Sequence, residues 1–204
     1  MDNDHKLTTN HPQLRLGLIL GSTRPGRRGD QIASWVLDTA RHHGGATYEL
    51  IDLADHNLGN LDEPGNPTLQ QYQHEHTRRW GKLIERFDGY VFITPEYNHS
   101  IPGALKNALD YIYKEWNDKA AGIVCYGGWA AGSRAAESLR MILPELQIAS
   151  VRAQVCVSTH ATFGTGAFVP NAPLTAAVEM MLTQLLAWAQ GMRSVREAKA
   201  SLAA

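Results

Sequence analysis

The chain has 204 residues, with 19 lysines and arginines against 20 aspartates and glutamates, which gives a formal net charge of -1. This length is typical of one domain with a sizeable core, and the near-neutral charge argues against a face for nucleic acid or an anionic membrane. The polar start MDNDHKLTTNHPQ has no apolar segment typical of signal peptides, and no apolar run reaches the ~20 residues of a membrane helix. We therefore expect a soluble, cytoplasmic protein without nucleic-acid or membrane partners.

The two cysteines, Cys125 and Cys156, both lie in apolar runs, GIVCYG and AQVCVS. Free cysteines are among the most buried residues, so we expect both to be buried in strands rather than joined in a secreted disulfide framework. The nine histidines are scattered and show none of the spacings typical of metal ligands. The sequence therefore predicts no metal site.

Short apolar segments alternate with amphipathic segments along the chain, which indicates strands alternating with helices. The predicted strands are residues 14–20, 47–53, 89–95, 120–127 and 148–158. The predicted helices begin near residue 30, cover residues 68–87, begin at residue 102 and after residue 132, and cover residues 174–190. We expect a single domain over residues 14–190, a disordered lead-in at 1–13 and a polar tail at 191–204.

Continuous apolar strands joined by helices predict a parallel sheet covered on both faces. Right-handed crossovers restrict the topology to a few arrangements, of which the strand order 2-1-3-4-5 fits five strands best. Ligands bind such sheets beyond the carboxyl ends of the strands, where the strand order reverses. In this order the reversal lies between the first and third strands, so the loops that follow them are the first place to look for a site.

The loop after the first strand has the sequence GSTRPGRRG and leads into a helix. A glycine-rich turn before a helix N-terminus is a common phosphate site, because unpaired N–H groups and the positive helix end point at the anion. Ser22 can donate its hydroxyl, and Arg24 can add a charge-assisted hydrogen bond. Asp30 could simply cap the helix; beside a phosphate we expect it to contribute its backbone only, since its carboxylate would repel the anion. The alternative is a solvated turn with surface arginines.

This loop differs from the common nucleotide-binding motifs. The pattern G-x-G-x-x-G is absent. Gly21 and Gly26 have the P-loop spacing, but Arg27 and Arg28 stand where that motif has Lys and Ser or Thr. The missing hydroxyl removes the magnesium ligand and argues against nucleotide hydrolysis. No G-x-S-x-G elbow occurs either, so a serine hydrolase is poorly supported.

Two further loops carry unusual residues. PEYNHSIP, after the third strand, holds an aromatic ring, an amide and a carboxylate between prolines, which suits the face and polar edge of a planar ligand. YGGWAAGSR, after the fourth strand, has paired glycines that allow close backbone approach. The alternatives are a rigid turn without a site, and a tight turn with Trp129 as a packing residue. All three loops should meet at one sheet edge.

Three segments resemble, in this order, the NAD(P)H-dependent FMN reductases, a group that includes quinone, azo-dye and chromate reductases. The segments are GSTRPGRRG followed by QIA, then PEYNHSIPGALKNALDYI, then YGGWAAGSRAAESLR. The resemblance covers roughly residues 14–186 and implies a flavodoxin-like three-layer α/β sandwich, FMN as cofactor and NADPH or NADH as electron donor. It also implies a homodimer or homotetramer. Ala131 departs from the family pattern, which has a second glycine pair beginning there.

The resemblance also implies roles for individual residues. The FMN phosphate would be held by Ser22, Arg24 and the backbone of Asp30, Gln31 and Ile32. The isoalloxazine ring would be lined by Pro95, Glu96, Tyr97 and Asn98. Its pyrimidine edge would meet Gly127 and Gly128.

The predicted function is electron transfer from reduced nicotinamide through FMN to a small acceptor, such as a quinone, an azo compound, a metal oxyanion or a flavin. The flavin carries this chemistry, so we assign no side chain as acid, base or nucleophile, and we expect ping-pong kinetics. Two alternatives stay open. The chain could be an FMN-binding electron carrier or redox-sensing module, or it could bind another phosphorylated ligand without a redox role.

Overall fold

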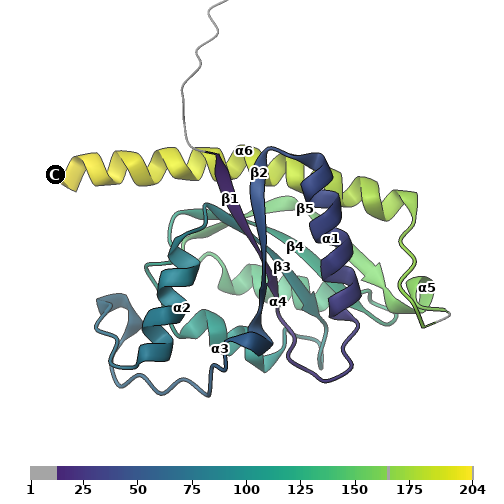
Figure 1. Cartoon of the computed structure of the whole chain (residues 1–204), viewed down its shortest axis with the longest axis horizontal. Helices are drawn as coiled ribbons and strands as arrows, with labels where there is room; N and C mark the ends of the chain where they lie inside the picture. Colours follow the sequence, from purple (N-terminus) through teal and green to yellow (C-terminus); the bar gives the residue numbers. More distant parts are fainter. Residues whose placement is uncertain (1–12, 165, 204) are drawn as a thin grey trace, which may run out of the picture.

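Figure 1 shows the computed structural model, which describes residues 13–164 and 166–203. Five parallel strands form one sheet in the order β2-β1-β3-β4-β5, as the sequence predicts. The strands are β1 (Leu14–Leu20), β2 (Ala46–Asp52), β3 (Gly89–Pro95), β4 (Lys119–Gly127) and β5 (Ile148–Ser158). The predicted lead-in of residues 1–13 lies outside the described residues except for Gln13.

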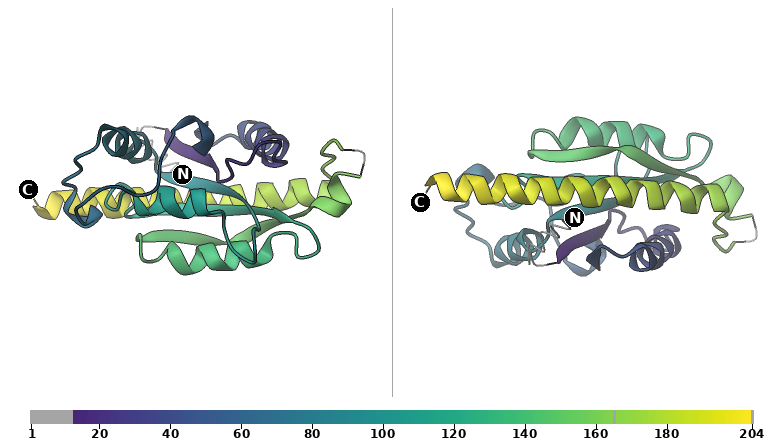
Figure 2. Two further views of the ribbon diagram at one scale, coloured as in Figure 1. Left: turned by 90° about the horizontal axis from the view of Figure 1, so that it is seen from below. Right: turned by 90° about the horizontal axis from the view of Figure 1, so that it is seen from above.

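Helices cover both faces of the sheet. They are α1 (Gly29–His43), α2 (Glu75–Glu85), α3 (Gly103–Asp110), α4 (Ser133–Ile142), α5 (Thr159–Thr162) and α6 (Ala172–Ala203), with 3₁₀ turns η1 (Leu53–Asp55) and η2 (Pro67–Leu69). Helices α1 and α6 pack on one face, and α2, α3 and α4 pack on the other. Figure 2 shows α6 running along the whole molecule. The result is the expected three-layer α/β sandwich.

The central strands are mostly apolar because both of their faces are covered. All seven residues of β3 are buried. Alternate side chains point to opposite faces, so Leu18 and Val91 join the core under α1 and α6, whereas Ile19 and Phe92 join the core under α2 and α3. This two-sided burial explains why the strands could be recognised as short continuous apolar runs.

The helix predicted over residues 68–87 is shorter in the structure, since α2 covers only Glu75–Glu85. The preceding segment leaves the helical path at Gln70, whose φ is 55°. The carboxylate of Glu63 then accepts hydrogen bonds from the backbone N–H groups of Gln73 at 2.8 Å and His74 at 2.9 Å. Side-chain bonds of this kind compete with helical bonds, so the prediction was wrong for the first part of this helix.

The predicted end of the last helix near residue 190 is also wrong, because α6 continues to Ala203. Its last turns are fixed by ion pairs to the amino edge of the sheet. Arg193 Nε lies 3.0 Å from Asp88 Oδ1, and Lys199 Nζ lies 2.7 Å from Asp118. These partners are far away in the sequence, so local patterns did not reveal them. Within the described ranges, no helix is long and apolar enough to cross a membrane.

The expectation that both cysteines are buried holds for Cys125 but is wrong for Cys156, which is only partly buried. Cys125 lies in β4, between two strands, whereas Cys156 lies in β5. In the described part of the chain, β5 forms the edge of the sheet and pairs with β4 alone. The edge position therefore leaves the Cys156 side chain accessible.

Candidate functional site

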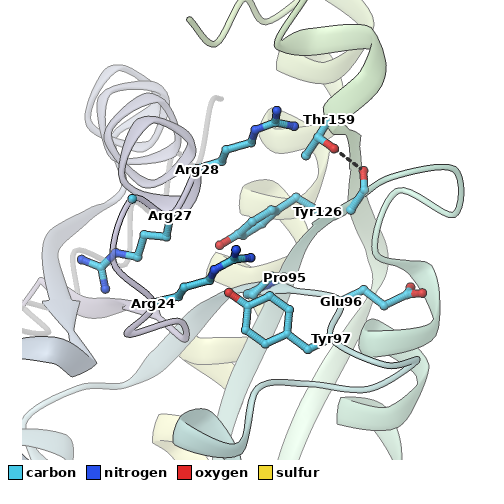
Figure 3. Close-up of a pocket in the computed structure, with 10 residues that line it drawn as sticks. Arg24, Arg27, Arg28, Pro95, Glu96, Tyr97, Tyr126 and Thr159 are labelled. Carbon is cyan, nitrogen blue, oxygen red and sulfur yellow. Dashed lines mark hydrogen bonds between the residues drawn. The ribbon is translucent and has the colours of Figure 1, made fainter. Parts of the chain in front are cut away.

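The three loops predicted to converge border one cavity at the carboxyl edge of the sheet (Figure 3). The cavity has a volume of about 380 Å³. Its lining consists of Arg24, Gly26, Arg27, Arg28, Pro95, Glu96, Tyr97, Tyr126, Gly127 and Thr159. The cavity lies beyond the ends of β1, β3 and β4, where the strand order reverses, which is the position that ligands favour in such sheets.

The structure places the predicted site residues in two groups. Five of them line the cavity: Arg24, Pro95, Glu96, Tyr97 and Gly127. The other six lie beside it or behind it: Ser22, Asp30, Gln31, Ile32, Asn98 and Gly128. Of this second group, Ser22 is fully buried, and its Oγ lies 2.8 Å from the hydroxyl of Tyr97. That hydrogen bond joins the loop after β1 to the loop after β3.

The N-terminus of α1 opens toward the cavity without a side-chain cap. The Asp30 carboxylate is bound instead to Arg27, whose Nε lies 2.9 Å from Asp30 Oδ1. Gln31 Oε1 accepts a hydrogen bond from the backbone N–H of Phe168 at 2.7 Å. Ile32 has its side chain in the core, so only its backbone can face a ligand. The first N–H groups of a helix lack helical partners, and here they are available to an anion.

Arg27 lines the cavity, but its charge is already matched. Its guanidinium donates to both carboxylate oxygens of Asp52, with Nη1 at 2.8 Å from Oδ1, and also to the carbonyl of Ser22. Burial alone would raise the pKa of Asp52, but the hydrogen bonds from Arg27 lower it below its usual value. The hydrogen bond to Asp52 likewise raises the pKa of Arg27. The ion pair therefore stays charged and fastens the loop after β1 to the end of β2.

Two other arginines keep their charge available. Within the described ranges, the guanidinium of Arg24 makes no hydrogen bond or ion pair. Arg28 lies over the ring of Phe163, with Cζ 4.8 Å from the ring centroid, and no described carboxylate pairs with it. Figure 3 shows Arg24 between the rings of Tyr97 and Tyr126. The cavity therefore combines cationic side chains with the positive end of α1, an arrangement suited to a phosphate.

Tyr126 supplies a further sign of a ligand. Its hydroxyl is buried and has no hydrogen-bond partner among the described residues. Buried hydroxyl groups are usually paired, and this hydroxyl belongs to a residue that lines the cavity. It lies so close to the start of α1 that a Cβ at Gly29 would approach it to 2.5 Å. A ligand anion at the helix N-terminus would give this hydroxyl an acceptor.

The loop after β3 forms a tight turn. The backbone groups of Tyr97 and Ser100 exchange hydrogen bonds of 2.9 and 3.0 Å, and Asn98 and His99 have φ values of 49° and 68°. Glu96 accepts hydrogen bonds from the Arg134 backbone at 3.1 Å and from its Nη1 at 2.6 Å. Since its carboxylate is held at the start of α4, Glu96 is unsuited to act as a general base.

The loop after β4 depends on glycine. A Cβ at Gly132, whose φ is 86°, would lie 2.4 Å from the backbone nitrogen of Tyr126. Ala131 also has a left-handed φ, of 50°. Ala131, which departs from the family pattern, thus adopts a backbone conformation that costs L-residues ~1–2 kcal/mol. Trp129 is 94 % exposed and contacts the ring of His160, so it is not a packing residue of the core.

Sequence reasoning did not assign roles to Arg27, Arg28, Tyr126 and Thr159, all of which line the cavity. Tyr126 and the arginines lie within the loops that were singled out, so their proximity could have been inferred. Thr159 was missed because it follows β5, a strand outside the three expected to converge. Its hydroxyl donates to the carbonyl of Gly127 at 3.0 Å and so supports the loop after β4.

The fold and the cavity define a flavodoxin-like α/β protein whose site is suited to a phosphorylated ligand. A family model for NADPH-dependent FMN reductases matches residues 14–162, and the chain belongs to this family. This membership confirms the assignment made from the sequence, with FMN and reduced nicotinamide as the family's cofactors.

Curated relatives agree with this assignment. An NAD(P)H-dependent FMN reductase of Schizosaccharomyces pombe is 44% identical over 122 residues, covering 59% of this chain and 61% of the relative, which is less than two thirds of its length. An NAD(P)H-dependent FMN reductase of Saccharomyces cerevisiae is 31% identical over 146 residues, which cover 66% of this chain and 76% of the relative. Among solved structures, the flavoenzyme FerB of Paracoccus denitrificans matches with a TM-score of 0.69 at 20% identity, over 88% of this chain and 98% of that chain. The likeness to FerB shows the shared fold.

Proposed function

We propose that this chain binds FMN in the cavity after β1, β3 and β4 and uses it to carry electrons from NADPH or NADH to a small acceptor. Family membership supports the reaction class. The observation that carries the proposal is the cavity itself, where an uncapped helix N-terminus meets the Arg24 guanidinium and the Tyr126 hydroxyl, neither of which has a hydrogen-bond partner among the described residues.

The start of α1 is the proposed phosphate site. Its first-turn N–H groups at Asp30, Gln31 and Ile32 would donate to the phosphate oxygens, and Arg24 would add a charge-assisted hydrogen bond. Ser22 is buried beside Tyr97, so its hydroxyl is positioned to share in this network. The ion pair of Arg27 with Asp52 keeps the loop in place.

The loops after β3 and β4 are the proposed site of the isoalloxazine ring. Pro95 and Tyr97 line the cavity on one side and Gly127 lines it on another, while Asn98 and Gly128 lie next to them in the same loops. When bound, FMN supplies the chemistry, because it accepts hydride from reduced nicotinamide and passes electrons onward. The protein binds and orients the ring. Glu96 is held by Arg134, which supports a site without a side-chain acid or base.

The proposed acceptor is a small molecule that enters the space vacated by the oxidised nicotinamide. Relatives from Solanum tuberosum and Pseudomonas putida carry the names NAD(P)H:quinone oxidoreductase and quinone reductase. Quinones are accordingly the first acceptors to test, followed by azo compounds, metal oxyanions and free flavin. A cytoplasmic location is a further part of the proposal.

The proposal includes a homo-oligomer, in which α6 packs against a second copy of the chain. The outer face of the second half of this helix carries exposed apolar side chains, namely Trp188, Val195 and Leu202. They recur at spacings of seven residues and so lie along one stripe of the helix. A dimer or tetramer would bury this stripe.

Steady-state kinetics test the proposed reaction. Initial rates measured at several NADPH and quinone concentrations should give parallel double-reciprocal lines, because donor and acceptor use the same space in turn. Intersecting lines would show that both substrates bind together and would contradict the shared space. FMN that binds but is not reduced would favour the electron-carrier alternative.

A further inference from the structure

Cys125 and Cys156 face each other across two neighbouring strands. They are paired in the register of β4 and β5, and their Sγ atoms lie 3.5 Å apart. Neighbouring strands are separated by ~4.7–4.9 Å, a spacing within the range of Cα distances that a disulfide spans. A bond between the two sulfurs therefore requires no large backbone movement.

The two thiols differ in access. Cys125 is fully buried, and its Sγ lies 3.4 Å from the carbonyl oxygen of Val155. Cys156 is partly exposed at the edge strand and borders a cavity of about 540 Å³ between β5 and α6. This cavity is lined by Arg152, Ala153, Gln154, Cys156, Pro173, Ala176, Ala177 and Met180. Because Cys156 is partly exposed and does not line the cavity assigned to FMN, a small oxidant can reach it from outside that cavity.

The surroundings of Cys156 stabilise a thiolate. Cys125 donates its S–H toward Cys156 Sγ, and Gln154 Nε2 lies 3.1 Å from the same sulfur. The Gln154 side chain is positioned by Arg140, whose Nε lies 3.3 Å from Gln154 Oε1. Despite partial burial, the hydrogen bond from Cys125, the bond from Gln154 and the charge of Arg140 lower the pKa of Cys156 to about 6. The same hydrogen bond and burial raise the pKa of Cys125.

We propose that Cys125 and Cys156 form a redox-active dithiol, in which hydrogen peroxide oxidises Cys156 and Cys125 resolves the product to a disulfide across β4 and β5. The Cys156 thiolate attacks one peroxide oxygen, the O–O bond breaks, and the leaving hydroxide takes up a proton to form water. Cys125 sulfur then attacks the Cys156 sulfenic acid, which releases a second water. In total two thiols and one peroxide give one disulfide and two waters.

The arrangement assigns different roles to the two sulfurs. Cys156 is the accessible thiol, and its sulfur lies 3.5 Å from Cys125 Sγ and 3.1 Å from Gln154 Nε2, so it reacts first. Cys125 is shielded from peroxide but lies within 3.5 Å of the sulfur that becomes electrophilic. The pair therefore favours a reversible disulfide over irreversible oxidation of Cys156.

The test treats the full chain, reduced and freed of reductant, with hydrogen peroxide at neutral pH. The two titratable thiols should disappear together, and the intact chain should lose two hydrogen atoms in mass while remaining one chain without reductant. Dithiothreitol should restore both thiols. Because the chain has only two cysteines, any disulfide within it identifies this pair.

Two variants separate the roles. Cys125→Ala should stop at a sulfenic acid on Cys156 that dimedone traps, whereas Cys156→Ala should lower the rate of thiol loss by about tenfold or more. In the unmodified chain, three outcomes would each overturn the proposal: unreacted thiols, a disulfide between two chains, or sulfinic acid on Cys156 beside a free Cys125. These measurements need no FMN, so their outcome does not depend on whether the proposed reductase activity is correct.

Discussion

The two edges of the sheet differ in how many of their charged side chains are paired. At the amino edge, Asp88 and Asp118 are paired with Arg193, Arg196 and Lys199 from α6. At the carboxyl edge, Arg24 and Arg28 line a cavity without a described carboxylate to neutralise them, and the Tyr126 hydroxyl has no described partner. The first edge completes its interactions within the chain, whereas the second leaves interactions for a ligand.

This contrast separates stability from binding. The ion pairs at the amino edge hold α6 on the sheet, so substitutions that break them should alter the free energy of unfolding. Cations left without a partner add little to folding but are available to a phosphate. Substitutions at the amino edge should therefore affect stability, and substitutions at the cavity should affect FMN affinity.

The largest effect is expected at Asp88, which is buried with Arg193 and Arg196 beside it. Burial alone would raise the pKa of Asp88, but the hydrogen bonds from Arg193 and from the Arg15 backbone lower it. Asp88→Ala removes the carboxylate and should lower the unfolding free energy by about 3–5 kcal/mol, measured by urea unfolding. Asp38→Ala, which removes an exposed pair with Arg41, should change it by less than about 0.5 kcal/mol. Equal effects would remove the distinction between the two edges.

Arg24→Ala tests whether the guanidinium of Arg24, which has no described partner, binds the FMN phosphate. Loss of a charge-assisted hydrogen bond should weaken FMN binding by about 10–100-fold. The quenching of FMN fluorescence on binding measures this affinity. The midpoint of urea unfolding should change little. Arg41→Ala removes a cation from the far end of α1 and should leave FMN affinity unchanged. If both variants bind FMN like the unmodified chain, the phosphate does not lie at Arg24.

Lys119, at the amino edge, should make the stability of the fold depend on pH. It is buried, and its Nζ lies 2.9 Å from the carbonyl oxygen of Ile84, 3.2 Å from that of Glu85 and 2.9 Å from the Tyr90 hydroxyl. Burial, with the nearby positive Arg196, lowers the pKa of Lys119 from 10.5 to about 7. Between these values the unfolded chain binds a proton that the folded chain does not, so the contribution of Lys119 to stability rises with pH.

Measuring the unfolding free energy of Lys119→Met across this pH range checks whether the contribution of Lys119 to stability rises or falls with pH. The difference in unfolding free energy between the unmodified chain and Lys119→Met should increase by about 1 kcal/mol per pH unit from pH 7 upward. The exposed Lys82→Met variant is the control for the loss of one lysine. A flat or falling difference for Lys119→Met would mean that this lysine stays protonated in the folded chain.

The smallest effect is expected at Ala131, whose φ is 50°. Ala131→Gly should raise the unfolding free energy by about 0.5–1 kcal/mol, because relief of the left-handed conformation outweighs the entropy cost of glycine. Ala130→Gly is the matched control, since Ala130 has no positive φ and should only lose stability. A loss at Ala131 as well would show that its methyl group supports the loop.

The strands and the three loops of the cavity followed from the sequence because their signals are local. An apolar run ending at glycine or proline defines β1 and β3, and chain order then brings their loops together. The glycine pair after β4 was recognisable in the same way, since a Cβ at Gly127 would lie 2.9 Å from the backbone nitrogen of Gly132.

Long-range partners could not be predicted from the sequence. Asp52 binds Arg27 across 25 positions, and Asp88 binds Arg193 across 105. The first pair decides which arginines are available to a ligand, and the second fixes the last turns of α6. Glu63 likewise shortens α2 by binding the backbone before it. Such partners become visible only once the chain is folded.

The decisive measurement is the visible absorbance spectrum of the chain, loaded with FMN and then mixed with NADPH without oxygen. We expect a bound-flavin spectrum that bleaches rapidly on addition of NADPH, and Arg24→Ala should need more FMN to reach the same spectrum. A chain that binds no FMN at any tested concentration would overturn the proposed function.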